Sequence, residues 1–497
     1  MMLRKQPHGV WLGALGVLAA SMVLFTCRSS VPQPAVRPEA AQAESVPAEP
    51  GVQDEQALPC APGARCLKVD DSGNIDPDGT SIAQCSGTFP DYIVPATQFP
   101  ADYQGPWFRL AQSFPKTRPR KPKLPWAKID YSKGVAEANA YLYALRDYSF
   151  AGMIAADFKP EKNRVRGWFH VPLMNFGPGQ RELIHGVTRE RTLRAPELGI
   201  KPGVSVANYA VGFYNSLGAY AIGKAWTAAN PPDLTASKFP EGSMVFKILF
   251  SAAKPEDFVV PADYILEGAP EWQVATGNGR LTTIRLLQMD VAVRDDRAAA
   301  TGWVFGTFAY DRNAPDTDPW KRLRPVGLMW GNDPEYTPAD QAAGKPLKES
   351  IVSDQITPYA KSHLGWAGRV NGPVDNPASS CMSCHSTAQI AVNAPMIPPR
   401  SCDTDAKKLL WFRNVAGNQA FGAVNADNCT LVTRVPAAVP LDYSLQMQVA
   451  AQSVLQFRDK NPCAAEESPG PGVAAEAVTE TIRSGAERVT REGTDGQ

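Results

Sequence analysis

A Cys-x-x-Cys-His segment constrains this chain more than any other feature of its sequence. Cys381 and Cys384 are two residues apart, and His385 directly follows the second cysteine. Covalent haem is attached at such a segment: both thiols add across the haem vinyl groups, and the histidine nitrogen binds the iron. Because two thioethers and one Fe–N bond must close on a single rigid ring, the segment has to form a compact turn. The sequence therefore predicts one covalent haem c held by Cys381, Cys384 and His385.

Three other interpretations of the motif compete with haem. They are a structural cysteine pair, a redox-active Cys-x-x-Cys and half of a zinc site. A zinc site needs a second ligand pair, and no other two cysteines in the chain have the spacing of Cys381 and Cys384. A thioredoxin-like site belongs at a strand-to-helix turn of a βαβ unit. The haem interpretation uses all three residues of the motif, and we prefer it.

The N-terminus predicts export. Arg4 and Lys5 form a basic start, and the apolar run over residues 10–25 is shorter than the roughly 20 residues of a comfortable membrane-spanning helix. Residues 1–26 are therefore typical of a secretory signal peptide. Haem c is attached outside the cytoplasm, in compartments where thiols can be oxidised, so the two predictions agree. We expect the protein in the periplasm or cell envelope.

Cys27, directly after this segment, is a candidate for lipidation. Leu24 precedes it by three residues, as in bacterial lipoprotein cleavage sites, whereas Thr26 and Phe25 depart from the usual small residues. An ordinary cleaved signal and an uncleaved N-terminal anchor are the alternatives. Residues 27–58 are rich in Pro, Ala, Glu and Gln and are expected to form a flexible tether. This arrangement predicts a protein anchored to a membrane by a lipid.

The other cysteines predict disulfides. Nine cysteines minus Cys27, Cys381 and Cys384 leave six, of which three lie early and three late: Cys60, Cys66, Cys85, Cys402, Cys429 and Cys463. An even number in an exported chain suggests up to three bridges, whose connectivity the sequence does not decide. If all six pair, at least one bridge joins the early group to the late group. Buried unpaired thiols are the alternative.

Length and charge bound the domain organisation and the partners. The chain has 497 residues, which leaves room for two or three domains after the signal. We predict an α+β domain at 59–360, a haem-binding region at 361–463 and a disordered tail at 464–497.

The formal net charge is zero, so it does not argue for nucleic-acid binding. One basic cluster is interpreted as a solvated proline-rich loop, with a docking patch as the alternative: Lys116, Arg118, Arg120, Lys121 and Lys123.

Hydrophobic periodicity predicts helices in the first half of the large domain. Residues 134–148 carry apolar side chains at helical spacing. Residues 205–226 are apolar nearly all round, which predicts one buried helix, or two helical pieces broken near Gly218 and Gly223.

The pattern then changes to that of strands. Four runs of β-branched and aromatic residues predict antiparallel strands at 244–250, 281–293, 302–310 and 324–330. Residues 294–297 resemble a hairpin connection. Phe305 and Phe308 are expected on opposite faces of their strand, and Gly306 marks a place where a backbone or ligand approaches closely. The fold class is therefore α+β, with a large antiparallel, sandwich-like or curved sheet.

The C-terminal region is organised around the motif. Residues 371–377 have strong turn chemistry and lead into it, and two amphipathic helices are predicted at 405–421 and 442–457. A helix carrying Cys-x-x-Cys-His, followed by further helices, resembles the element order of a monohaem cytochrome c over at most the last quarter of the chain. This resemblance implies a mainly helical region around the haem.

The large middle region also resembles an uncharacterised family of exported bacterial proteins that end in a haem c motif. The segments that carry this resemblance are Trp-Phe-His-Val-Pro at 168–172, Trp-Val-Phe-Gly-Thr-Phe at 303–308 and Ser-Ser-Cys-Met-Ser-Cys-His at 379–385. The family implies an exported, haem-binding protein and brings no established reaction with it.

The second axial ligand decides what such a haem can do. An iron with two protein ligands transfers electrons, whereas an open sixth position can bind oxygen, peroxide or small gases. The candidates are one residue before the motif, two after it and two in the large domain: His363, Met396, Met447, His170 and His185. Met396 lies only eleven residues after His385, and Met447 lies on an apolar helical face, where core packing is the alternative. An open or water-bound site is the remaining alternative.

Electron transfer is the preferred function, with a redox partner protein or a small electron donor or acceptor. The chain is much longer than a small carrier needs, which favours a haem-dependent peroxidase or oxygenase as the alternative. Its substrate pocket would use aromatic, histidine and arginine side chains of the large domain: Arg166, Trp168, His170, His185, Arg189, Trp303 and Tyr310. A haem-based gas or redox sensor ranks third, because no signalling module is attached.

Overall fold

The computed structural model describes residues 100–460, except 101, 107, 121, 172–180, 227–232, 276–278 and 393, and three short strands within 66–95. The chain divides into two units, Met1–Glu55 and Gln56–Gln497, and every described residue belongs to the second. The expected signal peptide, Cys27, the tether and the 464–497 tail lie outside the described residues. Within the described part, none of the helices has the length and hydropathy of a membrane-spanning segment.

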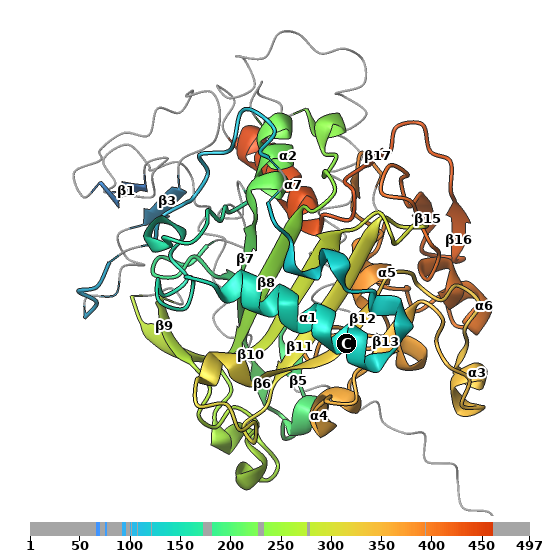
Figure 1. Ribbon diagram of the computed structural model, residues 1–497, viewed down its shortest axis with the longest axis horizontal. Helices are drawn as coiled ribbons and strands as arrows, with labels where there is room; N and C mark the ends of the chain where they lie inside the picture. Colours follow the sequence, from blue (N-terminus) through green and yellow to red (C-terminus); the bar gives the residue numbers. More distant parts are fainter. Residues whose placement is uncertain are drawn as a thin grey trace, which may run out of the picture. The chain divides into compact units, whose positions relative to one another are not determined.

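An eight-stranded antiparallel sheet forms the centre of the described fold (Figure 1). Its strand order is β13-β12-β11-β10-β8-β7-β4, and β9 also pairs with β10. In that order the strands are Ser350–Val352, Leu323–Met329, Trp303–Tyr310, Leu281–Arg294, Met244–Ser251, Asn208–Tyr214 and Thr188–Arg189, with β9 at Glu271–Ala275. All four predicted strands are confirmed, and β10 and β11 form the predicted hairpin. An antiparallel sheet with a few helices is therefore the observed architecture.

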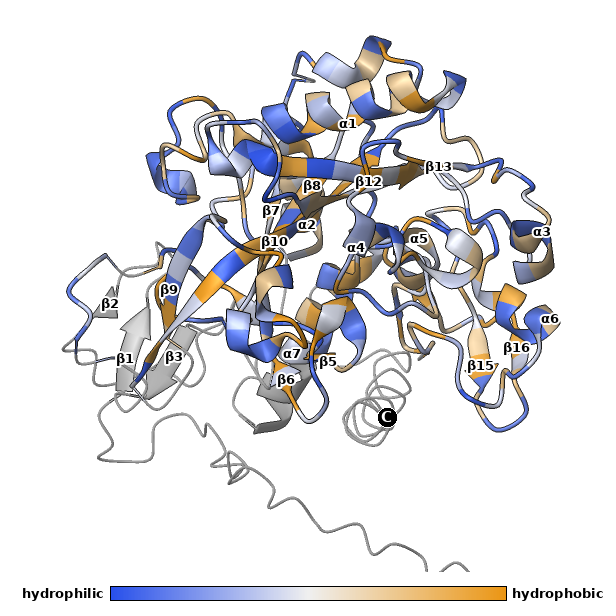
Figure 2. Cartoon of the chain, turned by 90° about the horizontal axis from the view of Figure 1, so that it is seen from below, coloured by the Kyte–Doolittle hydropathy of each residue, from blue (hydrophilic) through white to orange (hydrophobic). Residues whose placement is uncertain are grey.

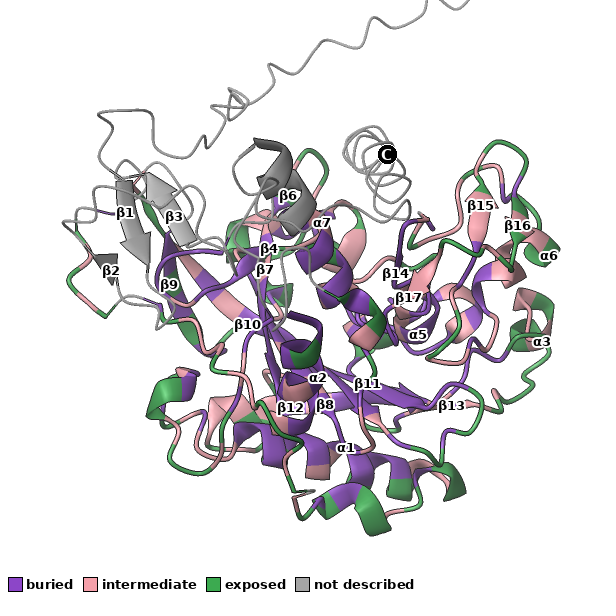
Figure 3. Cartoon of the chain, turned by 90° about the horizontal axis from the view of Figure 1, so that it is seen from above, coloured by how far each residue is buried: buried purple, intermediate pink, exposed green. Residues whose placement is uncertain are grey.

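Two separate cores cover the two faces of this sheet. Figures 2 and 3 show α1 on one side of the sheet and α5 and α7 on the other. Successive strand residues point to opposite faces, so Phe305 and Phe308 enter different cores, as predicted. We call them the α1-side core, which includes Tyr141, Leu142, Leu145, Phe246, Ile248, Met289 and Phe308, and the motif-side core, which includes Tyr214, Ala292, Trp303, Phe305, Val370, Met382, Tyr443 and Met447.

The helix predicted at 134–148 is confirmed as α1, Val135–Phe150. It packs closely on the sheet because β11 has a glycine beneath it. A Cβ atom at Gly306 would lie 2.3 Å from Cδ2 of Leu142, well inside van der Waals contact. The close approach expected at Gly306 is therefore made by a side chain of α1.

Replacing Gly306 by alanine is expected to lower the free energy of unfolding by about 1–3 kcal/mol, because the fully buried Leu142 must shift in a packed core. Chemical denaturation followed by circular dichroism measures this change. Gly167→Ala is the matched control: a Cβ there comes no closer than 3.4 Å to the Phe169 ring, so we expect an effect within about 0.5 kcal/mol. Equal effects of the two variants would contradict the packing role of Gly306.

The segment 205–226, predicted as helix, is helical only in its second half. It contains β6 (Ser205–Val206), β7 and then α2 (Ser216–Trp226). β7 lies between β4 and β8, with side chains buried on both faces of the sheet. A strand buried on both faces has a continuous apolar run, which periodicity alone does not distinguish from a buried helix.

A mainly helical C-terminal region is not shown. The helix predicted at 442–457 is present as α7, Leu445–Lys460, but the one predicted at 405–421 is reduced to α6, Asp405–Lys408, and a short 3₁₀ turn. The apolar residues after α6 are buried in a small core of their own instead of on a helix face: Trp411, Phe412, Val415 and Phe421. Short strand pairs lie between the helices: β14 (Gln389–Ile390) with β17 (Val439–Pro440), and β15 (Ala423–Asn425) with β16 (Thr430–Val432).

The described chain contains further short strands and α-helices. They are β1 (Cys66–Val69), β2 (Ile75–Asp76), β3 (Tyr92–Pro95), β5 (Leu193–Arg194), α3 (Pro338–Ala342), α4 (Pro358–Lys361) and α5 (Cys381–His385). Of these, α5 carries the Cys-x-x-Cys-His motif and contacts β11 on the motif side of the sheet.

Candidate functional site

The motif forms a single helical turn, α5, whose start is set by two serines. Ser380 Oγ accepts a hydrogen bond from Ser383 N at 3.1 Å, and Ser380 N donates to Ser383 Oγ at 2.8 Å. This reciprocal cap satisfies backbone groups that a helix start leaves without partners. Cys381 and Cys384 are unpaired, half-buried thiols on this turn, and burial raises the pKa of both, that of Cys384 to about 12. Two reduced thiols and one imidazole therefore leave the same short turn.

His385 is held in one orientation. Its Nδ1 lies 2.9 Å from the carbonyl oxygen of Tyr443, and its ring packs 4.8 Å from the ring of Phe305. A carbonyl oxygen only accepts, so Nδ1 carries the hydrogen and Nε2 keeps the lone pair that binds a metal. Burial lowers the pKa of His385 to about 4, so the imidazole is neutral at pH 7. This is how an iron-binding histidine is usually oriented.

A cavity of about 370 Å³ lies beside His385 on the motif side of the sheet. Apolar residues of the strands and of α7, together with Val171, line much of it: Ala210, Val245, Val291, Ala292, Phe305, Leu445 and Val449. Met396 also lines the cavity and is 46% exposed. His385 and Met396, the candidate proximal and distal iron ligands, therefore face the same cavity.

One end of the cavity is polar and charged. Lys247 Nζ lies 3.5 Å from Asp290 and 3.8 Å from Glu190, and all three residues line the cavity. Burial raises the pKa of Asp290 to about 6, against the influence of Lys247, and burial also raises the pKa of Glu190. The pKa of Lys247 is raised despite its burial, because Glu190, Asp290 and Asp375 stabilise the ammonium. The ammonium thus stays charged and neutralises part of the carboxylate charge.

Only two of the predicted substrate-pocket residues reach the cavity, namely Arg189 and Trp303. The other five lie elsewhere: Arg166, Trp168, His170, His185 and Tyr310.

Those five have other partners. The guanidinium of Arg166 lies over the Tyr148 ring, His185 stacks on Trp272, and Tyr310 OH donates to the carbonyl of Glu267. Trp168 is buried in the α1-side core. His170 is fully buried with its Nδ1 accepting from Ala111 N, and its pKa lies well below the ordinary value because of burial.

The remaining candidate ligands lie away from the cavity. His363 is buried, its Nε2 lies 3.1 Å from the carbonyl oxygen of Asp375, and it does not line the cavity. Met447 is fully buried in the motif-side core, in line with core packing. The structure therefore brings Met396, and not His363 or Met447, to the cavity that His385 faces.

Sequence reasoning missed the charged end of the cavity. Lys247 and Asp290 each lie inside a run of apolar residues that forms a central strand. A charge inside such a run is a signal in itself, since charged residues are almost never buried without a partner. The Tyr443 carbonyl had no comparable signal, because any residue has a carbonyl group.

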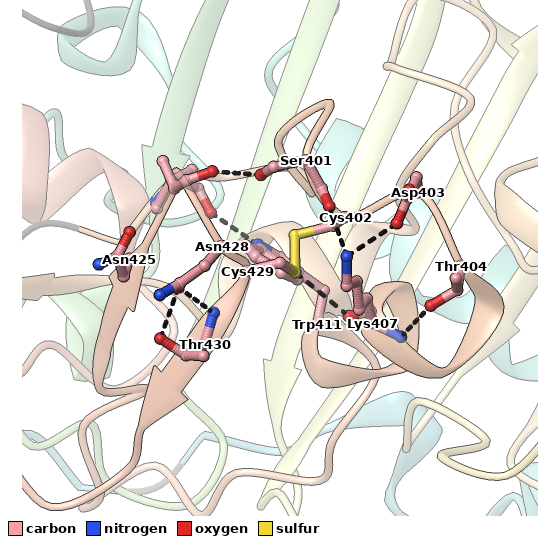
Figure 4. Close-up of a disulfide and its surroundings, with 12 residues drawn as sticks. Ser401, Cys402, Asp403, Thr404, Lys407, Trp411, Asn425, Asn428, Cys429 and Thr430 are labelled. Carbon is pink, nitrogen blue, oxygen red and sulfur yellow. Dashed lines mark hydrogen bonds and ion pairs between the residues drawn. A yellow bond between two sulfur atoms is a disulfide. The ribbon is translucent and has the colours of Figure 1, made fainter.

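One of the expected disulfides is present. Cys402 and Cys429, 27 residues apart in sequence, are bonded next to Trp411 (Figure 4). The side chains of Cys60, Cys66, Cys85 and Cys463 lie outside the described residues. If those four also pair, one bridge must join Cys463 to one of the early three.

Among the residues that the structure describes, no three His, Cys, Asp or Glu side chains converge as a metal-ion site.

Comparisons with known proteins give no guide to the function. No protein-family model, curated protein or solved structure matches the chain. The function therefore has to be inferred from the chemistry of the chain's own residues.

Proposed function

We propose that this protein is a monohaem c-type protein that transfers electrons in the bacterial cell envelope. One observation carries the proposal: the histidine of the Cys-x-x-Cys-His turn lines a cavity, with Nδ1 bonded to a backbone carbonyl and Nε2 left for iron. Export and attachment to the membrane through a lipid on Cys27 are part of the same proposal and rest on the sequence of residues 1–27. The motif and the cavity support the proposed haem attachment. This attachment does not require a cytochrome c fold.

The motif residues and the residues that line the cavity have distinct roles in this proposal. Haem, when bound, supplies one-electron chemistry. Cys381 and Cys384 would hold it covalently, and His385 would bind its iron. Apolar walls from the sheet and α7 make the cavity less polar than water, which strengthens electrostatic interactions inside it. Met396 is the side chain best placed among the candidates to be the second axial ligand, because it lines the same cavity as His385.

Carbon monoxide tests the second ligand. We expect the reduced wild-type protein to show no spectral shift with carbon monoxide, because Met396 fills the sixth position. The Met396→Ala variant should form a carbon monoxide adduct, and His363→Ala is the control that should behave as wild type. An adduct only with His363→Ala would make His363 the ligand.

A haem-dependent oxidoreductase is the second candidate function. The charged end of the cavity, with Lys247, Glu190 and Asp290, and the exposed Arg189 at its wall, favour it, since these groups could bind a polar substrate or move a proton. The carbon monoxide experiment decides between the two functions. An adduct of the wild-type protein would show an open sixth position and support the oxidoreductase.

A further inference from the structure

The backbone that orients His385 has an unusual conformation. Asp442 and Tyr443 both have positive φ angles, 47° and 65°. Residues other than glycine rarely adopt this left-handed region, and bulky ones least of all. Such a conformation costs roughly 1–3 kcal/mol per residue and persists only where the surrounding structure imposes it. Two consecutive cases next to a candidate iron ligand call for a physical cause.

The side chain of Asp442 supplies that cause. Its Oδ1 accepts a hydrogen bond from Trp303 Nε1 at 2.7 Å, and its Oδ2 accepts one from Phe239 N at 2.9 Å. Asp442 is buried, so these bonds are shielded from water. Gly417 makes room for the carboxylate: a Cβ atom there would lie 2.0 Å from Oδ1. Asp442 is therefore anchored to β11 and to the loop at Phe239.

The next two residues are anchored as well. Tyr443 OH donates to the carbonyl of Val415 at 2.5 Å, and the hydroxyls of Ser444 and Tyr214 lie 2.8 Å apart. All three side chains of the segment 442–444 are thus bonded to different parts of the fold. The carbonyl of Tyr443, between these anchors, is the group that meets Nδ1 of His385.

We propose that Asp442 is a positioning residue for the haem: through Trp303 and Phe239 it holds the left-handed backbone that presents the Tyr443 carbonyl to His385. When the imidazole nitrogen that does not bind the metal donates a hydrogen bond, the imidazole becomes a more basic ligand. A more basic ligand stabilises ferric over ferrous iron, so the Asp442 anchor lowers the reduction potential. This inference rests on the proposed haem function.

The test compares variants of the full-length, haem-loaded protein. Asp442→Ala loses both anchors. Asp442→Gly loses them too but tolerates positive φ without strain, and Asp442→Asn keeps one acceptor oxygen and a side chain that also tolerates positive φ. Asp427→Asn, at an exposed position in the same region, controls for the loss of one negative charge.

The readout is the midpoint potential from a spectroelectrochemical titration, together with covalent haem content from the pyridine haemochrome. In the alanine and glycine variants, we expect the equilibrium constant for reduction of the haem to rise at least tenfold. This corresponds to a rise in midpoint potential of about 59 mV for one electron. Asp442→Asn should fall between them and wild type, and Asp427→Asn should match wild type. A purely structural role would lower stability and leave the potential unchanged.

Two failures are distinguishable. Wild-type protein without covalent haem would overturn the proposed function itself. Covalent haem at the wild-type potential in Asp442→Gly would overturn the positioning role alone. If Asp442→Ala does not fold, Trp303→Phe replaces it, because this change removes the Nε1 donor to the carboxylate and keeps an aromatic ring at the same position. An unchanged potential in Trp303→Phe would likewise count against the role of Asp442.

Discussion

Replacing both Cys381 and Cys384 by serine is expected to abolish covalent haem completely. The two thiols lie on one helical turn and are the unpaired cysteines among the residues that the structure describes, so no described thiol can replace them. Each single variant should keep one thioether and show a shifted haemochrome band, because one vinyl group then stays unreacted. Extraction into acidified organic solvent separates the cases: haem stays with the wild-type protein and leaves the double variant.

The disulfide pair provides a matched control. Cys402→Ser with Cys429→Ser also removes two cysteines from the C-terminal region, but it should leave haem attachment intact. Its effect should be on stability, a loss of roughly 2–5 kcal/mol as for other native disulfides. Haem that extracts from the wild-type protein would refute covalent attachment, and the structural or redox interpretations of the cysteine pair would then be preferred.

Replacing Arg369 by alanine is expected to lower the free energy of unfolding by about 3–5 kcal/mol. Arg369 is fully buried, and its guanidinium donates to four backbone carbonyls: those of Asn332, Asp333, Tyr336 and Trp366. It also lies 4.4 Å from the centre of the Phe412 ring. Burial lowers the pKa of Arg369 to about 10, so it remains charged at pH 7. Without it, the four carbonyls lose a charged donor inside the fold.

Arg369 is linked to the Cys-x-x-Cys-His turn through its neighbour in the chain. The carbonyl of Val370, the next residue, accepts the hydrogen bond from Cys381 N at the start of α5. Arg369→Lys should be nearly as damaging as alanine, since one ammonium cannot reproduce the planar fork of donors. Chemical denaturation measures the loss, with exposed Arg434→Ala as the control expected within about 0.5 kcal/mol. A loss below about 1 kcal/mol for Arg369→Ala would show that water replaces its bonds.

Much of the fold could be predicted because the spacing of apolar residues within one helix or strand already indicates its secondary structure. The α1 helix and the four long strands have apolar residues at the spacing of their own secondary structure. Where the prediction failed, tertiary burial changed the pattern. β7 is apolar all round because both faces of the sheet are covered, and the residues after α6 are apolar because a loop buries them in its own small core.

The sequence by itself determined that two thiols and an imidazole leave one turn, because side chains within five residues lie together in any short helix. Only the tertiary structure decided what surrounds that turn. The carbonyl that orients His385 is 58 residues away in the chain, and Lys247, Asp290 and Met396 reach the same cavity from separate elements. Such contacts depend on how the sheet packs against α5 and α7, and no spacing along the chain encodes that packing.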